Sequence, residues 1–220
     1  MSRVTEFYRA AIGKKVVMGV TGLIGIGFVL GHMAGNLLVF GGPESINAYA
    51  HFLQSTGELL WLLRIVLVVA VILHIIAAVQ LTLQNRAARP VGYVKREPQV
   101  STWGSRTMRI GGFVLLVFIV LHILHFTTGD WRPSGSFSET DVYSNIVLSF
   151  RIWWVTLFYV VAMISLGLHL YHGAWSSVRS LGFYQPSKEP LHRTVALGVA
   201  VVLWAGFTIV PVAVFAGLIG

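Results

Sequence analysis

Hydrophobic residues along this chain fall into five long runs separated by polar connectors. The runs cover about residues 16–40, 59–84, 107–128, 152–178 and 194–218. Each is long enough to cross the hydrocarbon core of a bilayer as a helix, which takes about 20 residues. Turn-forming residues lie in the connectors, at Gly41-Gly42-Pro43, Arg89-Pro90, Thr128-Gly129-Asp130 and Gln185-Pro186. The pattern predicts an all-α membrane protein, a single domain over residues 1–220 built as a five-transmembrane-helix bundle. The connector from Gly129 to Phe150 has room for a further short helix, which the pattern leaves open.

Composition narrows the classes of protein that fit. Only 11% of the residues are charged, against about 25% in a soluble domain, so any large catalytic domain must belong to another polypeptide. The chain contains no cysteine, which excludes disulfides, cysteine-held iron–sulfur clusters and covalently attached haem within it. The formal charge of +8 suggests nucleic-acid binding, but the cations lie in connectors, where membrane orientation explains them better.

Positive charge is concentrated on one side of the predicted membrane. The N-terminal segment and the second and fourth connectors hold 13 of the 16 Lys and Arg residues. These are Arg3, Arg9, Lys14, Lys15, Arg86, Arg89, Lys95, Arg96, Arg106, Arg109, Arg179, Lys188 and Arg193. Because connectors rich in Lys and Arg stay in the cytoplasm, we expect a cytoplasmic N-terminus and a C-terminus outside. The expected location is a bacterial cytoplasmic membrane.

Four of the apolar runs each contain a histidine well inside the span, at His32, His74, His122 and His169. Ionisable residues at such depths are rare and indicate function. At a rise of about 1.5 Å per residue, His32 and His122 share an outer layer and His74 and His169 an inner one. A single membrane histidine is as well explained by a bond to Ser, Thr or a carbonyl. Four in two matched layers favour axial ligands for two b-type haems, each held from two helices.

Two of these runs offer a second histidine, at His125 and His172. Residues three apart share a helix face, so position alone does not select the ligand. The deeper residues, His122 and His169, match their partners' layers better. His125 and His172 would then lie nearer the membrane surfaces, where they can bond a haem propionate, water or quinone. A di-iron site is disfavoured because such sites need several carboxylates and no span contains one.

Small and cationic residues add to the haem hypothesis. Glycines repeat along the first run, at Gly19, Gly22, Gly25, Gly27, Gly31 and Gly35, and they allow close approach of a neighbouring helix or of a flat macrocycle. Haem propionates need cationic partners near the membrane faces. Arg151 at the outer face and Arg179 at the inner face are the preferred candidates.

An ordered set of short motifs resembles one known family across the whole chain. The motifs are Val20-Thr21-Gly22-Leu23, Gly31-His32-Met33, Leu73-His74, Leu121-His122-Ile123-Leu124, Ser149-Phe150-Arg151, and His169-x-x-x-Gly173 with Gly182 beyond. Together with five spans they resemble the di-haem cytochrome b subunit of succinate dehydrogenase and fumarate reductase, respiratory complex II.

The resemblance implies a ligand set, cofactors and partners. His32 and His122 would bind the outer haem iron, and His74 and His169 the inner one, with Arg151 near propionates. The subunit would anchor a flavoprotein carrying FAD and an iron–sulfur subunit on the cytoplasmic face, with a higher oligomer of the complex possible. Electrons would pass between succinate or fumarate and a membrane quinone, usually menaquinone.

The quinone site and the exact enzyme stay open at the level of sequence. Some members of this family carry a glutamate in the outer connector for quinol proton exchange; here that place falls near Gln54, which leaves Glu58 or His51 to serve, or neither. A haem anchor of a hydrogenase, formate dehydrogenase or nitrate reductase is the nearest alternative. A proton-coupled transporter without haem is a more distant one, since no span contains a carboxylate.

Overall fold

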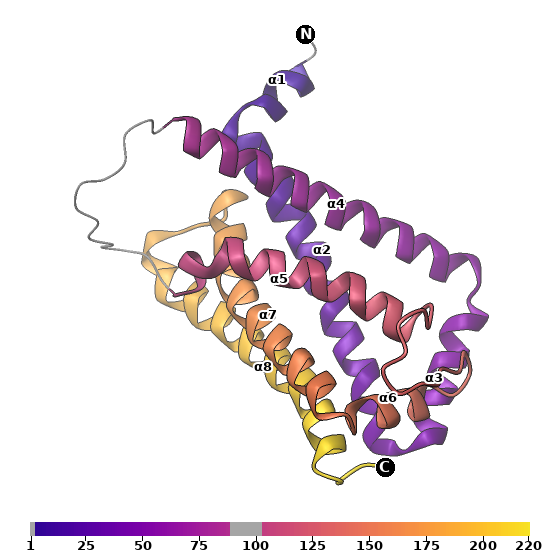
Figure 1. Cartoon of the computed structure of the whole chain (residues 1–220). Coiled ribbons are helices and arrows are strands. Elements are labelled where there is room, and N and C mark those ends of the chain that lie inside the picture. Colours follow the sequence, from indigo (N-terminus) through magenta and orange to yellow (C-terminus); the bar gives the residue numbers. More distant parts are fainter. Residues whose placement is uncertain (1–2, 89–102) are drawn as a thin grey trace.

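The computed structural model describes residues 3–88 and 103–220, and within them every regular element is a helix (Figure 1). Five helices are long and apolar enough to cross a membrane. They are α2 (Ala11–Leu37), α4 (Glu58–Ala87), α5 (Trp103–Phe126), α7 (Trp153–Ser180) and α8 (Glu189–Phe215). The predicted all-helical chain with five spans is confirmed. The turn expected at Arg89-Pro90 and the cations Arg89, Lys95 and Arg96 lie outside the described residues.

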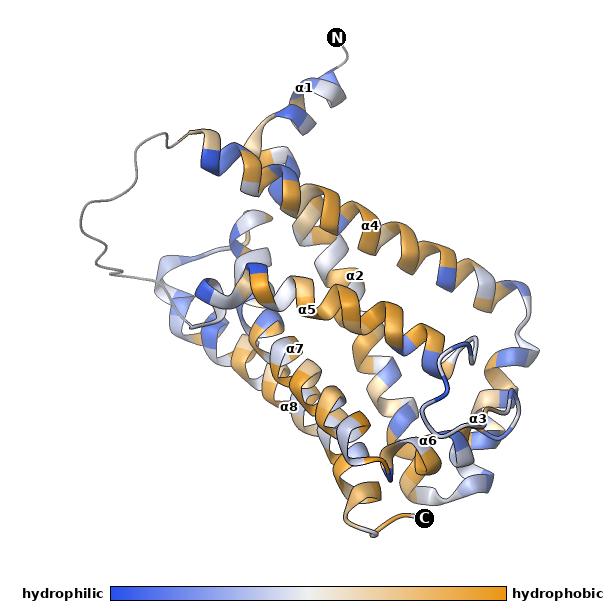
Figure 2. Cartoon of the chain, viewed as in Figure 1, coloured by the Kyte–Doolittle hydropathy of each residue, from blue (hydrophilic) through white to orange (hydrophobic). Residues whose placement is uncertain are grey.

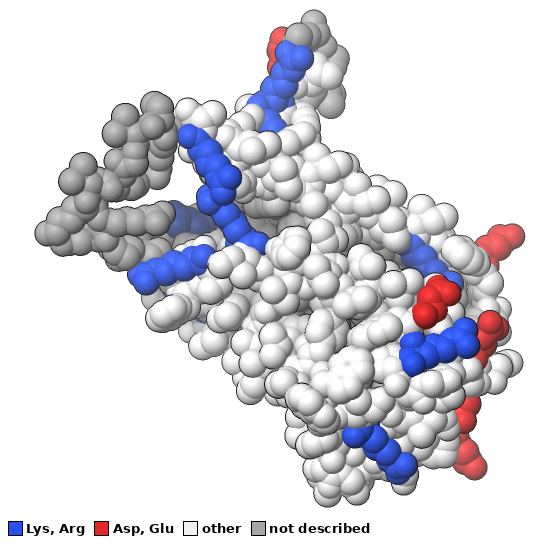
Figure 3. All heavy atoms as spheres, in the orientation of Figure 1, with Lys and Arg blue, Asp and Glu red and all other residues white. Residues whose placement is uncertain are grey.

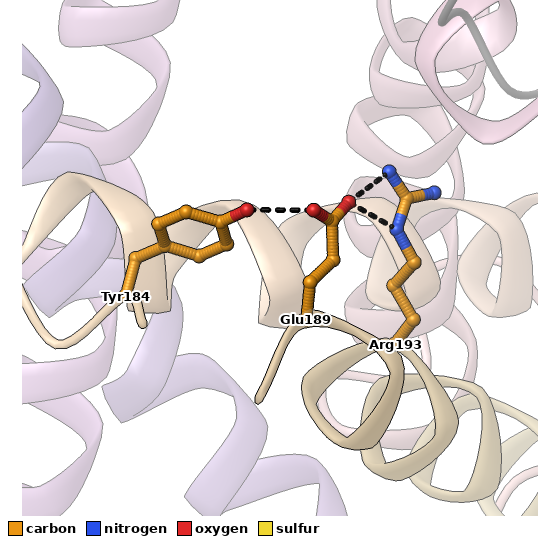
Figure 4. Close-up of polar contacts among 3 residues, drawn as sticks. All are labelled: Tyr184, Glu189 and Arg193. Carbon is orange, nitrogen blue, oxygen red and sulfur yellow. Dashed lines mark hydrogen bonds and ion pairs between the residues drawn. The ribbon is translucent and has the colours of Figure 1, made fainter. Parts of the chain in front are cut away.

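Helix α8 begins five residues earlier than the hydrophobic pattern predicts, because polar contacts organise its first turn. The Tyr184 hydroxyl donates to one carboxylate oxygen of Glu189 at 2.6 Å, and Arg193 pairs with the other oxygen at 2.7 Å (Figure 4). The hydrogen bond to Glu189 raises the pKa of Tyr184, so the hydroxyl keeps its donor hydrogen at physiological pH. Pro190 follows in the first turn, where its missing N–H has no cost. Helix α8 ends at Phe215 rather than at 218, and Gly217 follows with a φ of 73°.

Shorter elements fill the connectors and the N-terminus. They are α1 (Arg3–Arg9), the 3-10 turn η1 (Leu38–Gly41), α3 (Pro43–Ser55), α6 (Val142–Phe150) and the 3-10 turn η2 (Pro186–Lys188). Helix α6 is the additional helix for which the long connector from Gly129 to Phe150 has room. Helix α3 starts at Pro43 directly after Gly42, whose φ of 85° is easily adopted only by glycine.

The bundle is built around α2 and α7. Helix α7 packs on α2, α5 and α8, and α2 also carries α4, whereas α4 and α5 hardly touch each other. The buried core has one cluster between α7 and α8 beside α2, around Leu203, and a second where α6 meets α7 and α8. Hydrophobic residues dominate the long helices and hydrophilic residues gather at their ends (Figure 2). Much of the apolar surface, along α4 above all, is therefore available to lipid.

Charged side chains are distributed unequally between the two ends of the bundle. The termini lie at opposite ends (Figure 1), as an odd number of spans requires. In Figure 3 the cations gather at the end that carries the N-terminus, and most of the visible acidic side chains lie at the other end, around α3. This asymmetry agrees with the sequence, in which most Lys and Arg residues lie in the N-terminal segment and in the second and fourth connectors.

A polar latch joins α3 to the start of α6. The Asn47 side chain donates to Asp141 at 3.0 Å and accepts from the Tyr143 backbone N–H at 3.0 Å. Asp141 is the N-cap of α6 and also accepts from the backbone N–H and hydroxyl of Ser144. These hydrogen bonds lower the pKa of Asp141 below its ordinary 3.8. Its contribution to stability is therefore present above pH 3.8 and is lost only in stronger acid.

We expect Asn47→Ala to loosen the latch and to lower stability by about 1–2 kcal/mol, because Tyr143 N–H and Asp141 both lose a partner. Thermal unfolding of the purified protein in detergent measures the effect. Gln54→Ala is the matched control on the same helix, since Gln54 makes one exposed bond of 3.3 Å to the Glu139 carbonyl. Equal midpoints for the two variants would show that the latch contributes nothing.

Candidate functional site

His32 and His122 lie next to each other in the interior of the bundle. Helix α2 supplies His32 and α5 supplies His122, and the ring centroids are 5.8 Å apart with an angle of 81° between the planes. Phe28 stacks on the first ring at 5.3 Å and Phe118 on the second at 5.4 Å. Aromatic neighbours of this kind hold both imidazoles in place and exclude water.

His74 and His169 form the second pair. Helix α4 supplies His74 and α7 supplies His169, with ring centroids 6.1 Å apart and an angle of 53° between the planes. The structure thus brings together the same two pairs that the depth argument gives. In these pairs His122 and His169, rather than His125 and His172, meet the imidazoles of the other helices, and their role as haem ligands stays a prediction.

Thr21 fixes the tautomer of His74. The threonine hydroxyl has one hydrogen, which it donates to the Val17 carbonyl at 2.7 Å. Its oxygen is then free to accept, and His74 Nδ1 lies 3.1 Å away. Nδ1 therefore carries the hydrogen, and Nε2 keeps the lone pair with which an imidazole binds a metal.

His125 lies in the last turn of α5, nearer the end of the helix than His122. Its side chain is buried, with 3% of its surface exposed. Nδ1 lies 3.0 Å from the Tyr159 hydroxyl and Nε2 lies 2.8 Å from the Ser149 hydroxyl. The short helix α6 folds back under α5 and α7 and brings Ser149 to this point, which the hydrophobic pattern could not show. Both ring nitrogens are used, so His125 is not available to a propionate or a quinone.

His172 also lies apart from the pairs. It is half-buried, and its ring meets Trp175 edge-on at 6.3 Å. A methyl group added at Gly104 would lie 3.3 Å from the Cβ atom of His172. The side chain therefore belongs to the contact between α5 and α7 near the N-terminal end of the bundle.

The residues of both pairs fit a haem. When two imidazoles bind one iron, each iron–nitrogen bond is about 2 Å long, and each ring centroid lies one ring radius beyond its nitrogen. The two ring centroids are then about 6 Å apart. The observed separations are 5.8 and 6.1 Å. A haem would supply the remaining ligands of its iron from the porphyrin nitrogens.

Three further observations agree with this fit. A methyl group added at Gly25, Gly31 or Gly173 would meet nothing within 4 Å, so the helices leave space beside these positions. His169 Nδ1 is buried and has no hydrogen-bond partner among the described residues. A cavity of about 150 Å³ between α5 and α7 is lined in part by His169, Gly111 and Ser165.

The two arginines expected at propionates lie at opposite ends of the bundle. Arg151 caps the C-terminus of α6 and is exposed, and its guanidinium lies beside Gly220. The Arg179 guanidinium lies over Trp175 at 5.0 Å and over Tyr184 at 4.7 Å. Both keep hydrogen-bond donors at the ends of α7, and their role toward a propionate stays a prediction.

The two residues predicted for quinone chemistry lie at the end of the bundle opposite to the N-terminus. His51 belongs to α3 and Glu58 is the first residue of α4, and both side chains are exposed. An exposed carboxylate and an exposed imidazole can exchange protons with water. Whether they serve a quinone stays a prediction.

Thr21 and Tyr159 are the residues whose role the sequence did not reveal. Thr21 is part of a motif in the first run, and Tyr159 is the tyrosine of an otherwise apolar stretch ten residues before His169. A polar hydroxyl inside a membrane span needs a partner, and that need was the available signal. Which histidine each one meets depends on helix packing and could not be read from spacing.

Comparisons with known proteins leave the family unassigned, since no protein-family model, curated protein or solved structure matches the chain at a significant level. The resemblance to the di-haem cytochrome b subunits therefore stands on the motifs quoted from the sequence. The function has to be argued from the two histidine pairs and from the helices that hold them.

Proposed function

We propose that this chain is the cytochrome b membrane-anchor subunit of a succinate:quinone oxidoreductase and binds two b haems. The observation that carries the proposal is the arrangement of four membrane histidines as two pairs, with ring centroids 5.8 and 6.1 Å apart, in one bundle. When bound, each haem supplies an iron that carries one electron between partner subunits and quinone. The chain alone does not oxidise succinate.

The chain's own residues bind, orient and shield these groups. His32 with His122, and His74 with His169, provide imidazole nitrogens from facing helices. Thr21 keeps Nε2 of His74 free to bind iron, because its oxygen accepts from Nδ1. The surrounding aromatic rings keep water from the outer pair, and a lower local polarity is one of the factors that set a haem potential.

Partners supply the remaining redox centres. The chain contains no cysteine to hold an iron–sulfur cluster, so the proposed clusters would belong to an iron–sulfur subunit and the proposed FAD to a flavoprotein. The end with the N-terminus carries most of the visible cations (Figure 3), which supports a cytoplasmic position for it and for the partners docked there. The proposed location is the cytoplasmic membrane of a bacterium.

The proposed quinone is menaquinone, with Glu58 or His51 exchanging protons at the outer end. Electron transfer between an inner partner and an outer quinone would move charge across the membrane. Each charge moved is worth about 2.3 kcal/mol per 100 mV of membrane potential. In sealed vesicles with the partner subunits present, we expect uncouplers to change the rate of quinone reduction, and an unchanged rate would contradict an outer quinone site.

The direct test of the proposed function is haem quantification on the purified chain, with a dithionite-reduced minus oxidised spectrum. We expect two b-type haems per chain. A wild-type protein without haem would overturn the proposal and would favour a proton-coupled transporter that uses the histidines as a relay. Two haems with no binding of the succinate-oxidising partners would point to the anchor of a hydrogenase or formate dehydrogenase.

A further inference from the structure

A hydrogen-bonded chain of four side chains, His122 and three buried ones, runs from α5 to α7, back to α5 and on to α6. The Tyr159 hydroxyl lies 3.3 Å from Nδ1 of His122 and 3.0 Å from Nδ1 of His125. Nε2 of His125 lies 2.8 Å from the Ser149 hydroxyl. Tyr159, His125 and Ser149 are 5%, 3% and 2% exposed. Groups this deeply buried need partners, so their hydrogens have to be shared out consistently.

If His122 binds iron through Nε2, one arrangement of the hydrogens satisfies all the hydrogen bonds between these groups. This condition rests on the proposed function. Nδ1 of His122 then carries the hydrogen and donates to the Tyr159 oxygen. The single hydrogen of Tyr159 needs an acceptor, and Nδ1 of His125 is the one within reach among the described residues. His125 therefore carries its own hydrogen on Nε2 and donates it to Ser149.

We propose that Tyr159 and His125 are positioning residues for His122, which fix its tautomer and ring orientation through this one-way hydrogen-bonded chain. A ligand imidazole whose N–H is held by an acceptor donates more electron density to its metal. Because Tyr159 in turn donates to His125, its oxygen becomes a better acceptor than an isolated phenol. The chain therefore favours the oxidised iron and lowers the reduction potential of the outer haem.

The inner pair has a separate and simpler arrangement. Thr21 accepts from His74, to which the Met18 backbone is also hydrogen-bonded, and the described residues provide no partner for Nδ1 of His169. Neither Thr21 nor its acceptor Val17 takes part in the outer chain. A change in one arrangement should therefore alter the potential of one haem and leave the other unchanged.

The experiment is a redox titration of the haem-loaded chain, monitored by visible absorbance and by the low-spin ferric EPR signals. Tyr159→Phe keeps the ring that packs on Phe118 and Phe150, removes the hydroxyl, and should raise the midpoint of the outer haem alone. Thr21→Val is the matched control, and it should raise the midpoint of the inner haem alone. Each variant thus serves as the reference for the other.

His125 offers a second test that does not depend on Tyr159→Phe remaining folded. His125→Leu removes the acceptor and should shift the same haem in the same direction. His125→Asn keeps an acceptor near the position of Nδ1 and should restore the wild-type midpoint and EPR signal, which a role in packing alone does not explain. Loss of the outer haem from His125→Leu, restored in His125→Asn, would give the same support.

The outcomes separate this inference from the proposed function. Two haems with unchanged midpoints in Tyr159→Phe and His125→Leu would overturn the inference and leave the haem assignment intact. Equal shifts of both haems would also overturn it, because they would indicate a general change in the bundle. A wild-type chain that binds no haem would instead overturn the proposed function.

Discussion

Replacing His74 with alanine should halve the haem content of the purified chain, from two haems to one. His74 meets His169 across the bundle at 6.1 Å, and Thr21 keeps its Nε2 available for the iron. An alanine leaves no group in α4 that can take this place. The remaining haem should keep the spectrum and midpoint of the outer site. Pyridine haemochrome quantification, with a redox titration of the same sample, measures both quantities.

The complementary variant and a control complete this test. His122→Ala should remove the outer haem and spare the inner one, and the double variant should contain none. His172→Ala is the control, because His172 lies three residues after a proposed ligand and meets Trp175 instead of a second histidine. It should retain both haems. If His172→Ala lost a haem while His74→Ala kept two, the assignment of the inner pair would be wrong.

Much of the architecture could be predicted because the membrane imposes a simple pattern. A helix that crosses a bilayer must be apolar over about 20 residues, so α4 agrees within three residues at each end with the run expected at 59–84. Pairing of the histidines could be predicted from depth, since the rise per residue of a helix is fixed. The start of α8 was missed because Glu189 and Arg193 form an ion pair within a polar first turn.

The connectors and the supporting hydrogen bonds could not be predicted in the same way. Helices α3 and α6 lie at the end of the bundle opposite to the N-terminus (Figure 1) and are held by contacts between distant residues, such as Asn47 with Asp141. The sequence suggested that His125 is available to a haem propionate, because residue spacing shows only which face of the helix it lies on. Its burial comes from Ser149 and Tyr159, which two other helices bring to it. Such contacts depend on the three-dimensional path of the chain.

Leu203→Ala should lower the stability of the bundle by about 1–3 kcal/mol. Leu203 is fully buried between α7 and α8 beside α2. In a soluble core a Leu→Ala change costs about 2–5 kcal/mol, part for lost transfer from water and part for the cavity. Lipid is as apolar as the protein interior, so the free-energy cost of losing side-chain transfer from water largely disappears. The free-energy cost of the cavity remains. Thermal or denaturant unfolding in detergent measures the difference.

Leu197→Ala is the matched control, with the same substitution on the same helix. Leu197 is 51% exposed on the apolar surface, so lipid or detergent fills the space that the shorter side chain leaves. We expect a change within about 0.5 kcal/mol, as for other exposed positions. Equal losses at the two positions would mean that α8 is covered on its outer face by another protein surface. A loss at Leu203 alone would show that cavity formation between α7 and α8 sets the cost, and that the helices which hold His32 and His169 depend on this contact.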